Sequence, residues 1–254
     1  MRALVYNWDL ISNLVQRDIK LHYQRSFFGI LWSQINPLIS VIIFTIVFQK
    51  IVPLNIPNYP AYVFSGLLAW NWFSNSLNQA NFSLTSSRDL VRKPNFATEM
   101  IVVVSVSSNL VNYLLSMPVL FGLLIINNVP FTLTLFFLPV VIAIEFFFTL
   151  GLALIISAAN VFFRDVMHIT AVVTGIWFYI TPVFYRTAGT PNDFEFLYSL
   201  NPMNHLIQAY RQVLLYGQLP DLTTLAGLAA MALLTFGIGL FFFQRLKYDF
   251  VDAL

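Results

Sequence analysis

Long apolar runs separated by short polar links are the main feature of this chain. Six such runs occupy residues 30–52, 59–77, 100–126, 131–161, 168–185 and 222–243. A helix needs about 20 mostly apolar residues to cross a membrane, and these runs are of that order. The strands of a membrane barrel would instead alternate apolar and polar residues over about ten positions. The pattern therefore predicts an all-α integral membrane protein, with six transmembrane helices in a bundle over residues 30–243.

The composition supports a surface that faces lipid. The chain is 58% hydrophobic and 9% charged, whereas a soluble domain carries about 25% charged residues. Its 26 Phe, 11 Tyr and 5 Trp residues exceed what the core of a 254-residue protein must hide. The composition argues against a soluble enzyme, and the net charge of +2 gives no indication of a nucleic-acid partner.

The positive charges indicate how the chain is oriented in the membrane. An even number of spans places both termini on one side, and Lys and Arg are enriched in cytoplasmic loops. Three of the thirteen basic residues, Lys50 at the end of the first run, Arg186 and Arg211, belong to one set of loops. The other ten lie in the N-terminal segment, the 78–99 loop, the 162–167 turn and the tail 244–254: Arg2, Arg17, Lys20, Arg25, Arg88, Arg92, Lys93, Arg164, Arg245 and Lys247. We therefore expect both termini to be cytoplasmic, with residues 244–254 as a cytoplasmic tail.

The N-terminal segment 1–26 has the pattern of an amphipathic helix. It lacks the apolar core and small-residue cleavage site of a signal peptide. Apolar residues recur at helical spacing opposite a charged face, which is typical of a helix in the membrane interface. The apolar positions are Ile11, Leu14, Val15, Ile19 and Tyr23, and the charged ones are Asp9, Arg17, Asp18 and Lys20. The pattern alone does not distinguish a membrane anchor from a surface for a partner.

The segment between the fifth and sixth runs contains two apolar pieces that are too short to span. They occupy residues 194–200 and 203–216, on either side of Asn201 and Pro202. Apolar pieces of about 10 to 14 residues are usually re-entrant or interfacial, and Asn followed by Pro suits a helix start. We predict a pair of short re-entrant helices here, with Asn201 and Pro202 as an outer gate.

Motifs for catalysis or nucleotide binding are missing from the sequence. No segment fits the pattern Gly-x-x-x-x-Gly-Lys-Ser/Thr, which binds phosphates, or the Gly-x-Ser-x-Gly elbow of hydrolases. His22, His168 and His205 lie far apart and lack the spacing of a zinc peptidase, and the chain has no Cys. We expect no catalytic residue, metal or cofactor in this chain.

Polar residues within two predicted spans have two interpretations each. Glu145 in the fourth run is either part of a proton path or a carboxyl buried against a polar neighbour. In the third run, intervals of four, three and four residues place several polar side chains on one helix face. That face serves either helix packing or the lining of a substrate path. It consists of Ser105, Asn109, Asn112 and Ser116.

Several segments in order resemble the ABC-2 type permeases that export cell-surface polysaccharides. The first is VQRDIKLHYQRSFFGILWSQINP, residues 15–37, which is similar to the family form RDIK-x-RY-x-x-S-x-LG-x-x-W apart from His22 and Phe28. The next segment, YPAYVFSGLLAWNWFSNSL, resembles the second span of the family. The loop after it is LVRKPNFATEM, in which Ala97 replaces the usual proline. Two further segments similar to the family are NVFFRDV and LNPMNHLIQAYR.

The resemblance covers nearly the whole chain and implies a single ABC-2 transmembrane domain over residues 1–254. It implies a permease that forms a homodimer, binds two separate ATPase subunits that carry ATP and Mg, and moves a lipid-linked polysaccharide across the bacterial cytoplasmic membrane. O-antigen is the preferred substrate, and teichoic acid or capsule are the alternative substrates. The alternative function is an intramembrane enzyme that acts on lipid-linked sugars. The residues it implies as ATPase contacts are Arg17, Asp18, Lys20, Leu90, Arg92, Lys93, Glu99, Arg164 and Asp165.

Aromatic side chains in the second and fifth runs form a predicted glycan path. Sugars present apolar C–H faces that stack on rings, while their hydroxyls need polar partners. Trp and Tyr also form belts at membrane interfaces, which is the alternative interpretation. The predicted path residues are Tyr59, Tyr62, Trp70, Trp177, Tyr179 and Tyr185.

Overall fold

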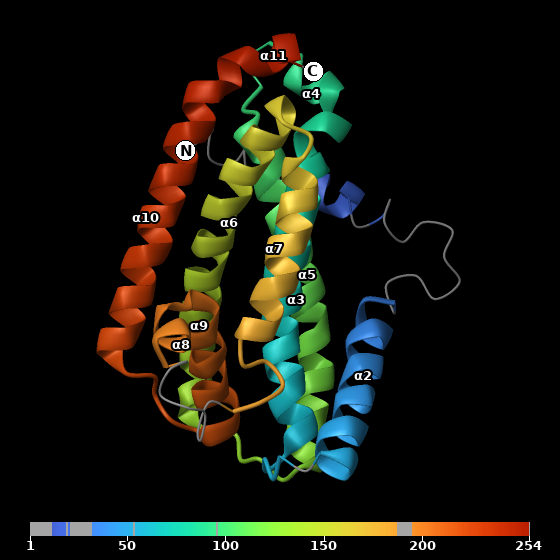
Figure 1. Cartoon of the computed structure of the whole chain (residues 1–254), viewed down its shortest axis with the longest axis vertical. Coiled ribbons are helices and arrows are strands. Elements are labelled where there is room, and N and C mark those ends of the chain that lie inside the picture. Colours follow the sequence, from blue (N-terminus) through green and yellow to red (C-terminus); the bar gives the residue numbers. More distant parts are fainter. Residues whose placement is uncertain are drawn as a thin grey trace.

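The computed structural model shows a helical bundle (Figure 1). It describes residues 12–18, 20, 32–52, 54–94, 96–186 and 195–253, and within these ranges every regular element is a helix. Much of the first family signature, from residue 21 to residue 31, lies outside the described residues. So does the start of the first predicted span.

The N-terminal helical segment, residues 12–18 and 20, precedes the labelled elements. The elements after it are, in order, α2 (Trp32–Thr45), η2 (Ile46–Ile51), α3 (Tyr59–Ser86), α4 (Arg88–Val91), α5 (Glu99–Ile126), η3 (Leu133–Phe137), α6 (Leu138–Phe162), α7 (Val166–Ile180), α8 (Glu195–Leu200), α9 (Pro202–Arg211), η5 (Gln212–Tyr216), α10 (Leu222–Leu246), η6 (Lys247–Asp249) and α11 (Phe250–Ala253). The long helices run side by side along the bundle, with α8 and α9 near one end and α4 and α11 at the other (Figure 1). We refer to these as the α9 end and the α4 end.

Four of the described helices are long and apolar enough to cross a membrane. They are Gln34–Ile51, Glu99–Ile126, Leu133–Phe162 and Leu222–Ala253, and Val166–Ile180 is a shorter apolar helix. The remaining long helix, α3, has 28 residues, but carboxamide and hydroxyl side chains recur along it. The chain is therefore a membrane protein with several apolar helices.

Helix α3 lies at the centre of the bundle and packs against α5 and α6, while α10 packs mainly along α6. Most of the α3 surface is buried, including Phe64, Phe73 and Leu84. Helices α6 and α10 approach closely where Gly151 faces Gly239, since a Cβ atom on Gly239 would lie 3.1 Å from Gly151 Cα. Glycine at this crossing lets the two backbones touch.

Two helix ends differ from the boundaries that hydropathy predicts. The second run ends at residue 77, but α3 continues to Ser86, because Asn, Gln and Ser lower hydropathy without breaking a helix. Several of these side chains bond to the backbone one turn earlier, as Asn81 Nδ2 does to Leu77 O at 3.3 Å. The fifth run extends to residue 185, but α7 ends at Ile180, two residues before Pro182, which lacks the N–H that a helix requires.

Candidate functional site

Asn201 begins α9 and ties it to the end of α7. Its Oδ1 accepts hydrogen bonds from the backbone N–H groups of Met203 at 3.1 Å and Asn204 at 3.4 Å, so it is the N-cap of the helix. The same oxygen accepts from Trp177 Nε1 at 2.8 Å, and Asn201 Nδ2 donates to Thr181 Oγ1 at 2.9 Å. The predicted helix start at the following proline is confirmed. Asn201 of the predicted gate and Trp177 of the predicted glycan path are thus directly hydrogen-bonded to each other.

Arg211, at the other end of α9, is 3% exposed. Its Nη1 donates to Tyr62 Oη at 2.8 Å and to Pro182 O at 2.9 Å, and its Nη2 donates to Val183 O at 2.6 Å. The guanidinium carbon also lies 3.5 Å from the centre of the Tyr62 ring, where the negative face of the ring attracts a cation. Gly66 leaves room for the group, because a Cβ there would lie 2.9 Å from Arg211 Nη2. Neutral carbonyls and a ring therefore stabilise a buried charge.

Two predicted path residues on α3 hold the segment that follows α7. The Tyr59 hydroxyl donates to Phe184 O at 2.8 Å, and the Tyr62 hydroxyl donates to Tyr185 O at 2.7 Å. Both tyrosines are buried in the chain. Together with Arg211 they satisfy the carbonyls of residues 182–185, which no helix satisfies. We call this group of contacts the carbonyl cluster.

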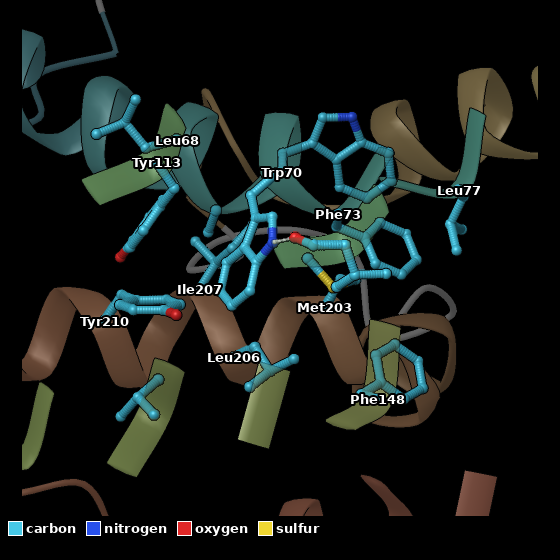
Figure 2. Close-up of a cluster of buried hydrophobic side chains, with 14 of the residues drawn as sticks. Leu68, Trp70, Phe73, Leu77, Tyr113, Phe148, Met203, Leu206, Ile207 and Tyr210 are labelled. Carbon is cyan, nitrogen blue, oxygen red and sulfur yellow. Dashed lines mark hydrogen bonds between the residues drawn. The ribbon is translucent and has the colours of Figure 1, made fainter. Parts of the chain in front are cut away.

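The remaining predicted path residues differ in exposure. Trp70 is buried, and its ring centre lies 6.4 Å from that of Trp177, whereas Tyr179 is 70% exposed. Figure 2 shows Trp70 in the apolar contact between α3 and α9, near Met203 and Leu206. The Tyr185 hydroxyl donates to Tyr179 O at 3.0 Å. Contact of these residues with a glycan stays a prediction.

Glu145 is buried on α6 and has a partner on α9. The Tyr210 hydroxyl donates to its Oε2 atom at 2.6 Å, while Oε1 has no hydrogen bond among the described residues. The interpretation of Glu145 as a carboxyl buried against a polar neighbour is confirmed. The contact adds a third attachment for α9, beside those of Asn201 and Arg211.

A cavity of about 910 Å³ lies between the N-terminal helical segment, α2, α3 and α5. The polar face predicted on α5 lines it with all four members, Ser105, Asn109, Asn112 and Ser116. A second polar stripe, on α3, lines the opposite wall and was missed in the sequence, although its interval of four residues is just as regular. That stripe consists of Asn71, Asn75, Gln79 and Ser83.

Hydrogen bonds join three walls of this cavity. Asn109 Nδ2 on α5 donates to Gln79 Oε1 on α3 at 2.6 Å, and Gln79 Nε2 donates to Asp18 Oδ2 at 3.1 Å. Asp18 is one of the predicted ATPase contacts, and Arg17 and Leu90 line the same cavity. The structure thus brings three of these nine predicted contacts together.

The other predicted ATPase contacts lie at or near the α4 end. Arg92 and Lys93 follow α4, Glu99 begins α5, and Arg164 and Asp165 form the turn between α6 and α7. These basic residues are exposed, as is Lys20 in the N-terminal helical segment. Their contact with an ATPase stays a prediction.

Comparisons with known proteins give a consistent result. The family model described as ABC-2 type transporter matches residues 9–215. The O-antigen export system permease protein RfbA of Myxococcus xanthus is 32% identical over 100% of this chain and 98% of its own length. A Klebsiella pneumoniae protein of the same name is 29% identical over 99% and 97%. The capsule polysaccharide export inner-membrane protein CtrC of Neisseria meningitidis serogroup A is 19% identical over 83% and 81%.

Proposed function

Because this chain belongs to the ABC-2 type transporter family, we propose that it is the membrane-spanning permease subunit of an ATP-driven exporter of lipid-linked polysaccharide. The proposed substrate is O-antigen, and the carrying observation is the 32% identity with an O-antigen export permease over the full length of both chains. A capsule polysaccharide is the second candidate, supported by the weaker 19% identity with a capsule export protein. The proposed location is the bacterial cytoplasmic (inner) membrane.

We propose six spans, with α3 and α7 added to the four clearly apolar helices. The 28 residues of α3 extend about 42 Å, which exceeds a hydrocarbon core of about 30 Å. The 15 residues of α7 extend only about 22 Å. Non-helical backbone is tolerated at membrane depth where protein groups satisfy it, and the carbonyl cluster does this for residues 182–185. This supports α7 and the residues after it as one span, and α8 and α9 as a re-entrant pair.

The basic residues support a cytoplasmic α4 end. Of those described, Lys50 lies in η2, Arg186 follows α7, and Arg211 ends α9, which is at the α9 end (Figure 1). The larger group includes Arg88 in α4, Arg92 and Lys93 after it, Arg164 between α6 and α7, Arg245 in α10 and Lys247 in η6, next to α11 at the α4 end; Arg17 and Lys20 lie in the N-terminal helical segment. By the positive-inside rule this orientation places both termini in the cytoplasm and the predicted gate, Asn201 and Pro202, outside.

The proposed partners are a second copy of this chain and two nucleotide-binding ATPase subunits, which bind the ATP and Mg. The exposed basic residues at the α4 end suit an ATPase docked on the cytoplasmic side. Helices α2 and α7 each present an exposed apolar face to lipid or to the second copy. These faces include Ile39, Ile42 and Ile43 on α2, Ile46 on the adjoining η2, and Ile169, Val172 and Ile176 on α7.

Deletion of the gene in its own bacterium tests this function. We expect the surface polysaccharide to disappear and lipid-linked glycan to accumulate on the cytoplasmic side, with recovery when this chain and its ATPase are restored together. Electrophoresis of lipopolysaccharide and staining for capsule distinguish the two substrates. Unchanged amounts of both surface polysaccharides in the deletion strain would contradict the proposal.

A further inference from the structure

The cavity between the N-terminal helical segment, α2, α3 and α5 has a mixed lining, in which many polar side chains lie beside apolar ones such as Leu68 and Val104. Its walls on α3 and α5 carry two regular stripes of carboxamide and hydroxyl groups. Burial of such groups away from water costs free energy unless they are hydrogen-bonded. A cavity that only filled space between membrane helices would be lined by apolar side chains, so the lining indicates a polar occupant.

Some of these polar groups have no partner in the described part of the chain. Ser105 is 3% exposed, it lines the cavity, and its Oγ atom has no hydrogen bond. The carboxamides of Asn71 and Asn75 also line the cavity and make no hydrogen bond to another described residue. The carboxamides of Asn71 and Asn75 on the α3 wall are therefore available to a ligand.

The charge of the lining favours a neutral ligand. Among the described lining residues only Arg17 and Asp18 are charged, and they have opposite signs. A phosphate or pyrophosphate group is usually bound by several cations, whereas the described lining offers only Arg17. Carboxamides and hydroxyls instead suit a ligand that is rich in hydroxyl groups.

Aromatic rings complete the lining. Trp32 and Phe82 line the cavity and are both substantially exposed. Trp72 and Tyr113 lie deeper, packed against each other with their ring centres 5.2 Å apart. The exposed rings offer stacking surfaces for the C–H faces of a sugar, while the neighbouring amides offer hydrogen bonds.

From these contacts we propose that the cavity binds a neutral sugar unit of the lipid-linked glycan, on the cytoplasmic side of each subunit. This proposal rests on the proposed function. The volume of about 910 Å³ lies within the usual range of about 300–1,000 Å³ for small-ligand pockets. The N-terminal helical segment forms one wall through the bond between Gln79 and Asp18, so the ligand lies beside the predicted ATPase contacts.

Cysteine labelling of the assembled transporter in lipid nanodiscs tests the site. The chain has no Cys, so Asn75→Cys introduces its single thiol inside the cavity, and Gln49→Cys is the control on an exposed helical residue outside it. The probe is the glycan released by mild acid from the surface polysaccharide of the same bacterium. We expect the glycan to slow maleimide labelling of Asn75→Cys but not of Gln49→Cys. Equal rates with and without glycan would overturn the proposal, as would protection by inorganic pyrophosphate instead.

A second experiment measures affinity. Replacing both Asn71 and Asn75 by Leu should weaken glycan binding to the complex about tenfold or more, because two carboxamides are lost. Asn78→Leu is the matched control, since Asn78 lies on the same helix and does not line the cavity. Unchanged glycan affinity in the double variant would overturn the proposal that the cavity is the binding site. The proposed function is tested separately by the gene deletion, and only retained surface glycan in the deletion strain would contradict it.

Discussion

The carbonyl cluster at the α9 end and the cavity between the N-terminal helical segment, α2, α3 and α5 are the two polar regions of this bundle. They differ in whether their polar groups find hydrogen-bond partners within the chain. At the α9 end, the Nη1 and Nη2 groups of Arg211 and the hydroxyls of Tyr59 and Tyr62 bond to other parts of the same chain, although Arg211 Nε has no partner among the described residues. In the cavity, Ser105, Asn71 and Asn75 are left without partners among the described residues. Polar residues of similar character in predicted spans thus have two uses. Those whose bonds close within the chain stabilise the fold, whereas those left open suit a ligand.

The largest effect is expected from Arg211→Met. Loss of the Arg211 guanidinium leaves the carbonyls of Pro182 and Val183 and the Tyr62 hydroxyl without a hydrogen-bond donor. Each buried group left in this way lowers the free energy of unfolding by about 1–3 kcal/mol. We expect a large fall in the melting temperature of the purified protein and poor accumulation in the membrane. Arg186→Met is the matched control, because that exposed cation lies 5.7 Å from the same ring. Equal melting temperatures for the two variants would show that the carbonyl cluster does not stabilise the fold.

A smaller loss of stability is expected from Gly239→Ala, where α10 crosses α6. The added methyl group would meet the backbone of Gly151, and such overpacking costs about 1–3 kcal/mol. Gly237→Ala is the control on the same helix, since a Cβ there meets nothing within 4 Å. Thermal unfolding in detergent compares them. A Gly239→Ala protein as stable as the Gly237→Ala protein would contradict the close crossing.

The comparison between the two regions predicts opposite effects for loss of a polar group. Tyr62→Phe should lower the melting temperature, because it removes the hydroxyl that donates to Tyr185 O and accepts from Arg211. Asn75→Leu should leave the melting temperature unchanged or raise it, because the carboxamide has no partner in the described residues to lose. Both are measured on the same purified complex. A destabilised Asn75→Leu protein would mean that the cavity wall is part of the stabilising structure.

The smallest effect concerns pH and the two helix caps near the α9 end. Hydrogen bonds from Thr223 and Thr224 hold the pKa of the Asp221 carboxyl below its usual value. A depressed pKa contributes stability that is present above the unfolded pKa and is lost as pH falls through the folded pKa. We therefore expect a slight loss of thermal stability below about pH 4 that Asp221→Asn does not show. The neutral cap at Asn201 should give no such dependence. Identical pH profiles for the wild type and Asp221→Asn would contradict this role.

Much of the fold follows from local patterns. The apolar runs predict α5, α6 and α10 well, because continuous apolar sequence has few alternatives in a membrane. The start of α9 follows from Asn201 and Pro202, whose capping and fixed backbone angle act within a few residues. The ends of α3 and α7 were not predictable from hydropathy, since one helix continues through polar residues and the other stops before Pro182.

The contacts of the candidate site depend on distant residues, which a single sequence does not reveal. Arg211 and Tyr62 are 149 positions apart, and Tyr210 and Glu145 are 65 apart. The polar face on α5 was visible as a spacing pattern. The equivalent stripe on α3 was overlooked because Trp72, Phe73 and other apolar residues between its members make the helix resemble an ordinary span. A search for polar residues at helical intervals within every run would have found it.

The carbonyl cluster also has a consequence for biosynthesis. Val183 accepts its hydrogen bond from Arg211, which is 28 residues later in the chain, so the ribosome makes the acceptor well before the donor. Until α9 has been synthesised, the segment after α7 lacks the group that balances its carbonyls, and it is poorly suited to hydrocarbon. The last part of the fifth proposed span therefore reaches its final place only when α9 folds back onto α3. Assembly of this half of the protein is a late event that α9 completes.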